Sequence, residues 1–185
     1  MNNYKYWEKF YNNQHTTEPS DFAKSLNLRG KSILDMGCGN GRDTLFLAKN
    51  NAVMGLDLFV EEYKDSKNPQ WMKCSIEKFI ETDTKAFDTL YARFLFHAID
   101  ADLQHDILKW AFDNMKEVYI ECRSNKGQTP DNTHERRLIH SRWILRECLW
   151  LGYDIKYFEE STGFAKYGDE DPIIIRLNLT HESSI

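Results

Sequence analysis

The sequence is poor in the residues and patterns that mark secreted, membrane-spanning and metal-binding proteins. It holds 4 cysteines and 4 prolines among 185 residues, and the cysteines are too scattered for a disulfide framework or a metal site. No apolar run approaches membrane-spanning length, and residues 1–11 lack the apolar segment of a signal peptide. Histidines and acids never gather at metal-ligand spacing. We therefore expect a cytoplasmic protein with reduced thiols, no metal and no membrane contact.

Positive charge is also in short supply. Lysine and arginine together number 24 against 29 for aspartate and glutamate, which leaves a formal net charge of −5. This acidic total argues against nucleic acid as the main partner. The chain shows no internal repeat, low-complexity tract or linker, so its length predicts a single domain over residues 1–185.

One stretch, Ser32–Asp43, combines an apolar run with three glycines at alternate positions. The apolar run is typical of a buried strand. Gly37, Gly39 and Gly41 then allow a sharp turn with positive φ and leave room for a ligand, and the residues that follow favour a helix. Such a unit presents free backbone N–H groups at a helix N-terminus, facing what lies beyond the carboxyl end of the strand.

Turns of this kind bind more than one class of small ligand. A dinucleotide fingerprint needs its third glycine three positions after the second, and Arg42 stands there instead. An acid, Asp35, precedes the alternate glycines, and a second acid, Asp57, ends the next apolar run. This pattern resembles motif I and the ribose-binding acid of class I S-adenosylmethionine (SAM) methyltransferases. The alternative is that both acids are helix-cap or turn acids.

The resemblance covers nearly the whole chain and implies the class I methyltransferase fold. That fold is α/β, with a Rossmann-like, mostly parallel sheet of seven strands, an antiparallel last strand and helices on both faces. Apolar runs predict strands near residues 33–34, 53–58, 70–74, 87–92, 117–123, 153–160 and 172–179. Helical spacing predicts helices near residues 4–11, 21–28, 44–49, 60–67, 103–115 and 133–150.

The resemblance also implies which residues hold the cofactor SAM and its product S-adenosyl-L-homocysteine (SAH). They follow the first four strands: Asp35, Gly37, Cys38, Gly39, Asp57, Leu58, Ser75, Ile76, Ala92 and Arg93. Ser75 departs from the family, which more often has an acid at this place beside the adenine. Trp7 and Tyr11 are predicted to cover SAM and the acceptor from an N-terminal helical lid, residues 1–28. The alternative is an aromatic stripe packed on the core.

Histidines and one arginine are the candidates for catalysis. Arg93 and His97 come just after the fourth strand, where an open α/β sheet forms its ligand crevice, and His134 starts the helix predicted over 133–150. We predict His134 or His97 as the base that takes a proton from the acceptor, because histidine titrates near neutral pH. The alternatives are a structural role for His97 and a buried ionic partner for Arg93.

Further arginines, Arg123, Arg136 and Arg137, are predicted to bind an anionic acceptor together with Tyr11. Arg136 and Arg137 would form a cationic first turn of the helix, which opposes the helix dipole and so favours a functional role. The alternative is a solvated helix face paired to Glu135.

Several later segments resemble small bacterial methyltransferases linked to surface-polysaccharide (capsule) synthesis. They are Arg93–Ile99, Glu121–Arg123, Asp131–Arg137 and Ala165–Arg176. This resemblance implies methyl transfer to an oxygen of a small anionic acceptor: a sugar, a sugar phosphate or another phosphate-type group. The alternatives are an RNA or protein methyltransferase, which the basic residues of 123–146 support, and a non-catalytic SAM-binding partner subunit. The oligomeric state and the choice between oxygen and nitrogen stay open.

Overall fold

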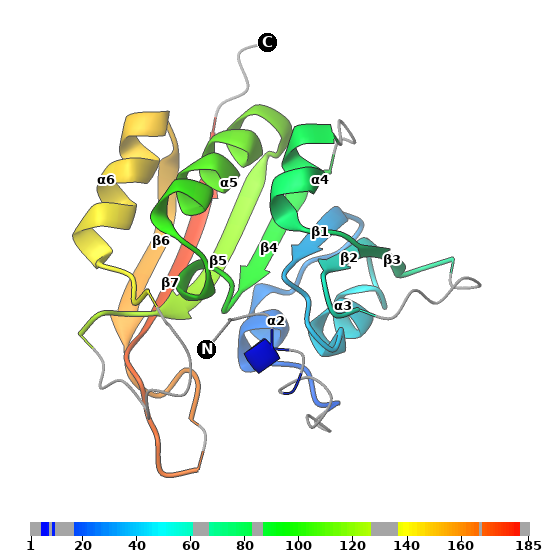
Figure 1. Ribbon diagram of the computed structural model, residues 1–185, viewed down its shortest axis with the longest axis horizontal. Helices are drawn as coiled ribbons and strands as arrows, with labels where there is room; N and C mark the ends of the chain where they lie inside the picture. The colour runs from blue at the N-terminus through cyan, green and yellow to red at the C-terminus, as the bar shows by residue number, and fades with distance from the viewer. Residues whose placement is uncertain are drawn as a thin grey trace.

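The structure, a computed structural model, describes residues 5–7, 9, 17–60, 67–82, 87–126, 137–166 and 168–181. Seven strands of these residues form one sheet in the order β3-β2-β1-β4-β5-β7-β6 (Figure 1). The strands are β1 (Ser32–Met36), β2 (Ala52–Asp57), β3 (Gln70–Lys73), β4 (Thr89–Arg93), β5 (Glu117–Arg123), β6 (Asp154–Ser161) and β7 (Ile174–Thr180). Each strand predicted from the sequence is therefore present.

The direction of the strands also agrees with the prediction. Strands β1 to β5 run parallel to one another, and β7 lies between β5 and β6 and is antiparallel to both. The carboxyl ends of β1, β2, β4 and β5 therefore meet at one edge of the sheet, which is where open α/β sheets bind ligands. The predicted mostly parallel sheet with an antiparallel last strand is confirmed.

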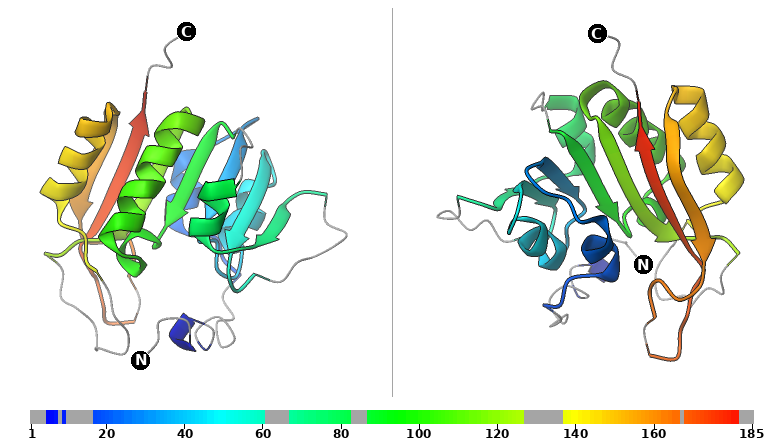
Figure 2. Two further views of the ribbon diagram at one scale, coloured as in Figure 1. Left: turned by 45° about the horizontal axis from the view of Figure 1, so that its top comes forward. Right: turned by 180° about the vertical axis from the view of Figure 1, so that it is seen from behind.

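Helices cover both faces of the sheet, as predicted (Figure 2). Two short helices, α2 (Asp21–Leu26) and α3 (Arg42–Leu47), lie on one face. The other face carries α4 (Ile76–Thr82), α5 (Ala101–Asn114), α6 (Ser141–Leu151) and the short 3-10 helix η1 (Phe96–Ala98). The two faces enclose two separate hydrophobic clusters, the larger one under α5 and α6.

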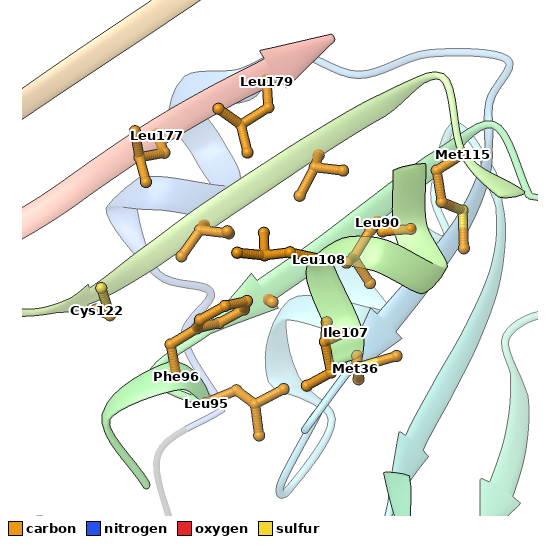
Figure 3. Close-up of a cluster of buried hydrophobic side chains, with 14 of the residues drawn as sticks. Met36, Leu90, Leu95, Phe96, Ile107, Leu108, Met115, Cys122, Leu177 and Leu179 are labelled. Carbon is orange, nitrogen blue, oxygen red and sulfur yellow. The ribbon is translucent and has the colours of Figure 1, made fainter. Parts of the chain in front are cut away.

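The larger cluster forms because α5 repeats apolar residues at helical spacing. Leu103, Ile107, Leu108 and Ala111 share one face of α5, and all four are buried. They pack on β4, β5 and β7 (Figure 3). Asp100 fixes the start of this helix by accepting a hydrogen bond from the Leu103 N–H group at 2.9 Å. Helix α5 is thus fixed against the sheet by its apolar face and by the cap at its start.

Helix α6 begins eight residues later than predicted. Residues 137–140 are not helical, and Ile139 forms a parallel bridge with Ser124 beyond the end of β5. The Ile139 N–H group donates to the Arg123 carbonyl at 3.0 Å, and the Asn125 N–H group donates to the Ile139 carbonyl at 2.9 Å. This pairing requires extended backbone, so the prediction that Arg137 belongs to the first turn of that helix was wrong, while Arg136 lies outside the described residues.

Helix α6 buries only one of its faces. Ile144 and Cys148 are buried, whereas Leu149 points outward with 61% exposure. Residues 61–66 of the helix predicted over 60–67 lie outside the described residues. Among the described helices, none combines the length and apolar character needed to cross a membrane.

Candidate functional site

The glycine turn joins β1 to α3 at the carboxyl edge of the sheet. Gly37, Gly39 and Gly41 all have positive φ, between 56° and 74°, a region that other residues rarely adopt. The N–H groups of Gly37 and Cys38 donate to the Leu56 carbonyl at 2.8 and 3.1 Å. The turn is therefore tied to β2, and the motif predicted from the sequence has the backbone that it requires.

Asp57, the last residue of β2, lies against this turn. One of its carboxylate oxygens accepts from the Gly39 N–H group at 2.9 Å, and the other accepts from the Phe59 N–H group at 2.9 Å. Burial raises the pKa of Asp57, while these backbone hydrogen bonds lower it. The carboxylate is only partly buried, and Leu58 beside it is 40% exposed. Asp57 thus serves as a turn acid and still reaches the ligand edge.

Asp35, at the end of β1, is almost completely buried, with 2% exposure. The Thr44 hydroxyl, in the first turn of α3, donates to its carboxylate at 2.6 Å. Burial raises the pKa of Asp35 to about 8 despite this hydrogen bond. The carboxyl group is therefore largely protonated at neutral pH, and a cationic ligand nearby would favour its ionised form.

Another buried acid, Asp43 in the first turn of α3, connects three elements. Its carboxylate accepts from the Ser20 N–H group, the Ser20 hydroxyl and the Tyr91 hydroxyl, each at 2.7 Å. Ser20 also caps α2 by accepting from the Ala23 N–H group at 3.1 Å. These hydrogen bonds link α2, α3 and β4 just after the glycine turn. The helix N-terminus also favours the negative charge of Asp43.

Three charged residues continue this polar network across the sheet. Arg93 on β4 and Arg176 on β7 each donate through Nε to the buried Glu121 carboxylate on β5, at 2.8 and 2.7 Å. Arg93 also lies 3.9 Å from Asp43. Burial raises the pKa of Glu121, and the two arginines oppose that shift. We call Arg93, Glu121 and Arg176 the arginine–glutamate row.

Arg176 is left with an unsatisfied donor. Its Nη2 atom is buried and has no hydrogen-bond partner among the described residues. An unpaired buried donor typically costs about 1–3 kcal/mol, and more when it is charged. Phe164, between β6 and β7, places its ring centroid 4.0 Å from the Arg176 guanidinium carbon, and Phe22 of α2 lies 5.1 Å away on the same measure.

The structure places His97 inside the protein beside Arg123. His97 is 2% exposed. Its Nδ1 atom accepts from the Arg123 N–H group at 3.2 Å, and its carbonyl accepts from the Arg137 N–H group at 2.9 Å. These bonds support the structural alternative for His97, whose catalytic role remains a prediction. Arg123 is within 3.6 Å of Glu170, and Arg137 is exposed.

The remaining predicted residues occupy varied places. The Ser75 hydroxyl accepts from the Lys78 N–H group at 3.3 Å at the start of α4, where Ile76 is the first helical residue. Ala92 is fully buried in β4, and Trp7 is partly buried with its ring 5.1 Å from that of Tyr6. Three predicted residues lie outside the described part of the chain: Tyr11, His134 and Arg136.

Sequence reasoning missed the buried partners in this network. Ser20, Asp43, Tyr91, Glu121 and Arg176 were not selected as site residues, although they connect the glycine turn to the arginine–glutamate row. One signal was available. Aligning the expected strands brings the arginine that ends β4 beside the acid near the end of β5, as the register now shows.

Comparison with known proteins gives matches along the sequence and in the fold. Residues 33–117 match the family described as a methyltransferase domain. The chain is 32% identical over 124 residues to phosphoethanolamine N-methyltransferase 3 of Arabidopsis thaliana, covering 60% of this chain and 25% of that protein. It is 31% identical over 102 residues to an uncharacterised protein of Haemophilus influenzae, covering 48% of this chain and 40% of that protein. The chain thus spans well under half the length of these relatives.

The fold matches solved methyltransferases at low sequence identity. Magnesium protoporphyrin IX methyltransferase from Synechocystis PCC 6803 with bound SAM superposes with a TM-score of 0.64 and 14% identity, covering 87% of this chain and 74% of the other. These matches agree with the enzyme class and the cofactor predicted from the sequence. The protein therefore has the fold of class I SAM-dependent methyltransferases, and its residues 33–117 match a methyltransferase domain.

Proposed function

We propose that this protein transfers a methyl group from SAM to an oxygen of a small anionic acceptor. The observation that carries the proposal is the meeting of Asp57 with the glycine turn at the carboxyl edge of the sheet. The residues there fit the cofactor, because a carboxylate suits the hydroxyls of a ribose and the glycines leave backbone without side chains beside it. SAM, when bound, supplies an activated methyl group on its sulfonium.

The residues of this chain would mainly bind and orient the two reactants. Asp57 would accept hydrogen bonds from the ribose, and Asp35, nearly neutral in the free protein, would become ionised beside the positive charge of SAM. Arginines at the same edge would hold the acceptor. Holding two reactants close and aligned is worth several kcal/mol, up to about 7–11 kcal/mol in favourable cases. A base is needed only if the acceptor oxygen still carries its proton.

An anionic acceptor is supported by charge and by one relative. Arg93, Arg123 and Arg176 all lie at or near the carboxyl ends of β4 and β5. The Arabidopsis relative is named for phosphoethanolamine, a small molecule with an anionic phosphate and an amine. That name makes nitrogen the second candidate for the methylated atom, and phosphoethanolamine a first acceptor to assay. A place in surface-polysaccharide synthesis rests on sequence resemblance alone.

The test is calorimetric titration with SAH, with NAD as the control ligand. We expect micromolar binding of SAH to the wild-type protein, no binding of NAD, and loss of SAH binding in Asp57→Ala. Asp106→Ala, which removes an exposed carboxylate from α5, is the matched control and should bind SAH normally. Absence of SAH binding to the wild-type protein would refute the proposal. Binding of SAH without turnover on any acceptor would instead favour a non-catalytic SAM-binding subunit.

A further inference from the structure

Arg176 is a buried charged residue with one donor atom that lacks a hydrogen-bond partner among the described residues. Its Nε atom donates to the Glu121 carboxylate at 2.7 Å, and its Nη2 atom is buried without a hydrogen-bond partner in the described part of the chain. Buried polar groups are nearly always paired in native proteins, so such an atom calls for an explanation such as an absent ligand. Arg176 itself is 9% exposed.

The guanidinium plane of Arg176 is held from several sides. The Phe164 ring lies 4.0 Å and the Phe22 ring 5.1 Å from its central carbon, and Glu121 fixes its Nε edge. Aromatic faces attract a guanidinium cation and hold its orientation. A donor held in this way is pre-organised for a planar, charge-assisted contact with an oxyanion.

The position of Arg176 in the sheet brings its unpaired donor close to the ligand edge. Glu121 carries one negative charge and is shared by two arginines, Arg93 and Arg176. Arg93 also lies 3.9 Å from Asp43, so these four charges balance, and an anion is favoured by the unpaired Nη2 donor of Arg176 rather than by excess charge. In the sheet, Glu121 is paired in register with Arg93 on one side and with Arg176 on the other, two residues before the carboxyl end of β5.

We propose that Arg176 binds an oxyanion of the methyl acceptor through Nη2, with Phe22 and Phe164 holding the guanidinium in place. The ligand class is a phosphate or carboxylate group on a small molecule. This inference rests on the proposed function, because it assumes that the acceptor occupies the edge beside the SAM site. Arg176 of β7 would thus join the arginines predicted from the sequence to bind the acceptor.

The experiment uses the full chain saturated with SAH, so that the probe anion has no access to the cofactor site. Inorganic phosphate and acetate are titrated separately at constant ionic strength, and binding is followed by calorimetry and, for phosphate, by phosphorus NMR line width. The variants are Arg176→Gln and Arg176→Lys. Arg146→Gln, which removes an exposed arginine from α6, is the matched control. SAH affinity and the thermal midpoint are measured on the same samples.

We expect phosphate, acetate or both to bind the wild type and Arg146→Gln equally. Affinity should fall at least tenfold in Arg176→Gln and at least fivefold in Arg176→Lys, with SAH affinity unchanged. Arg176→Lys decides the matter if Arg176→Gln does not fold, because its ammonium still pairs with Glu121 but lacks the Nη2 donor. If the role of Arg176 is purely structural, the two substitutions should lower the thermal midpoint of unfolding and leave the affinity for the anions unchanged. That result would overturn the inference.

Failure of both probe anions to bind the wild type would overturn the inference as well. The two proposals fail separately. Absence of SAH binding to the wild type refutes the proposed methyl transfer. Normal SAH binding, with the same anion affinity in the wild type and the Arg176 variants, refutes only the assignment of Arg176.

Discussion

Local surroundings give the acids of this protein different protonation states. Asp35 is sealed in the core with the Thr44 hydroxyl as its hydrogen-bond donor, and burial raises its pKa to about 8. Asp88 lies near the surface, and the hydrogen bond from the Ser32 N–H group lowers its pKa. The carboxyl group of Asp35 is therefore largely neutral and that of Asp88 is ionised, because only Asp35 is shielded from water.

The raised pKa of Asp35 makes stability depend on pH. Between about pH 4 and pH 8 the folded protein keeps a proton on Asp35 that the unfolded chain releases, so this group makes the free energy of unfolding fall as pH rises, by up to about 1.4 kcal/mol per pH unit. We expect Asp35→Asn to remove that slope. Urea denaturation of both proteins at pH 5, 6.5 and 8 measures it, with Asp106→Asn as control. Parallel pH curves for wild type and Asp35→Asn would contradict the assignment.

The two candidate histidines should respond differently to substitution. We expect His134→Ala to lower kcat about 100-fold or more if it is the base, measured with phosphoethanolamine or the acceptor found by screening. His97→Ala should instead lower the free energy of unfolding by about 1–3 kcal/mol, because it leaves the part-buried Arg123 N–H group without its imidazole acceptor. Full turnover in both folded variants would eliminate the histidine-base mechanism.

At the scale of elements, the start of α3 depends on β3. Trp71 of β3 packs against Gly41 and Gly55, so that a Cβ atom at Gly41 would lie 2.3 Å from the end of the indole. Gly41 also has φ of 74° as the residue before the first turn of α3. The third glycine of the turn is therefore required by a neighbouring strand as well as by its own backbone, and β3 limits the path of the turn.

We expect Gly41→Ala to destabilise the protein by about 2–5 kcal/mol. Left-handed backbone costs an alanine about 1–2 kcal/mol, and overpacking against Trp71 adds about 1–3 kcal/mol. Gly30→Ala is the matched control, because Gly30 has φ of 65° but no atom within 4 Å of its added Cβ. Denaturant unfolding of the two variants separates the two costs. Equal destabilisation would show that Trp71 moves aside.

Across the whole molecule, buried polar contacts extend from the glycine turn to β7. It links Asp35 with Thr44 in α3, Asp43 with Tyr91 in β4, and Arg93 with Glu121 and Arg176 in β5 and β7. Polar groups that are buried and paired in this way hold the strands that carry them in one arrangement. The glycine turn and the arginine–glutamate row are therefore connected through buried polar side chains.

The overall charge allows a test against the RNA-methyltransferase alternative. With a net charge of −5, the protein should be repelled by a polyanion, although it carries arginines at its ligand edge. We expect no binding of a generic single-stranded RNA to the SAH-loaded protein at about 150 mM salt, where charges are screened beyond roughly 8 Å. Fluorescence anisotropy measures this. Tight binding that weakens steeply with salt would favour the RNA alternative.

Strand periodicity and the glycine motif predicted the strands and the turn that begins at Gly37, and the resemblance to class I methyltransferases implied the sheet with its antiparallel last strand. They failed at α6, because Ile139 pairs with Ser124 across a separation that no local pattern reveals. They also did not predict the contact of Arg176 with Glu121. This contact depends on which strands are neighbours, and β7 lies beside β5 only through the antiparallel insertion.

The order of the elements, the turn geometry at Gly37, Gly39 and Gly41, and the places of Asp35 and Asp57 at the strand ends follow from residues close together in the chain. Which charges meet depends instead on how distant segments pack. Glu121 contacts Arg93 from 28 residues away and Arg176 from 55 residues away. Burial of that cluster, which raises the pKa of Glu121 and leaves Nη2 of Arg176 without a described partner, results from strand order and packing rather than from local pattern.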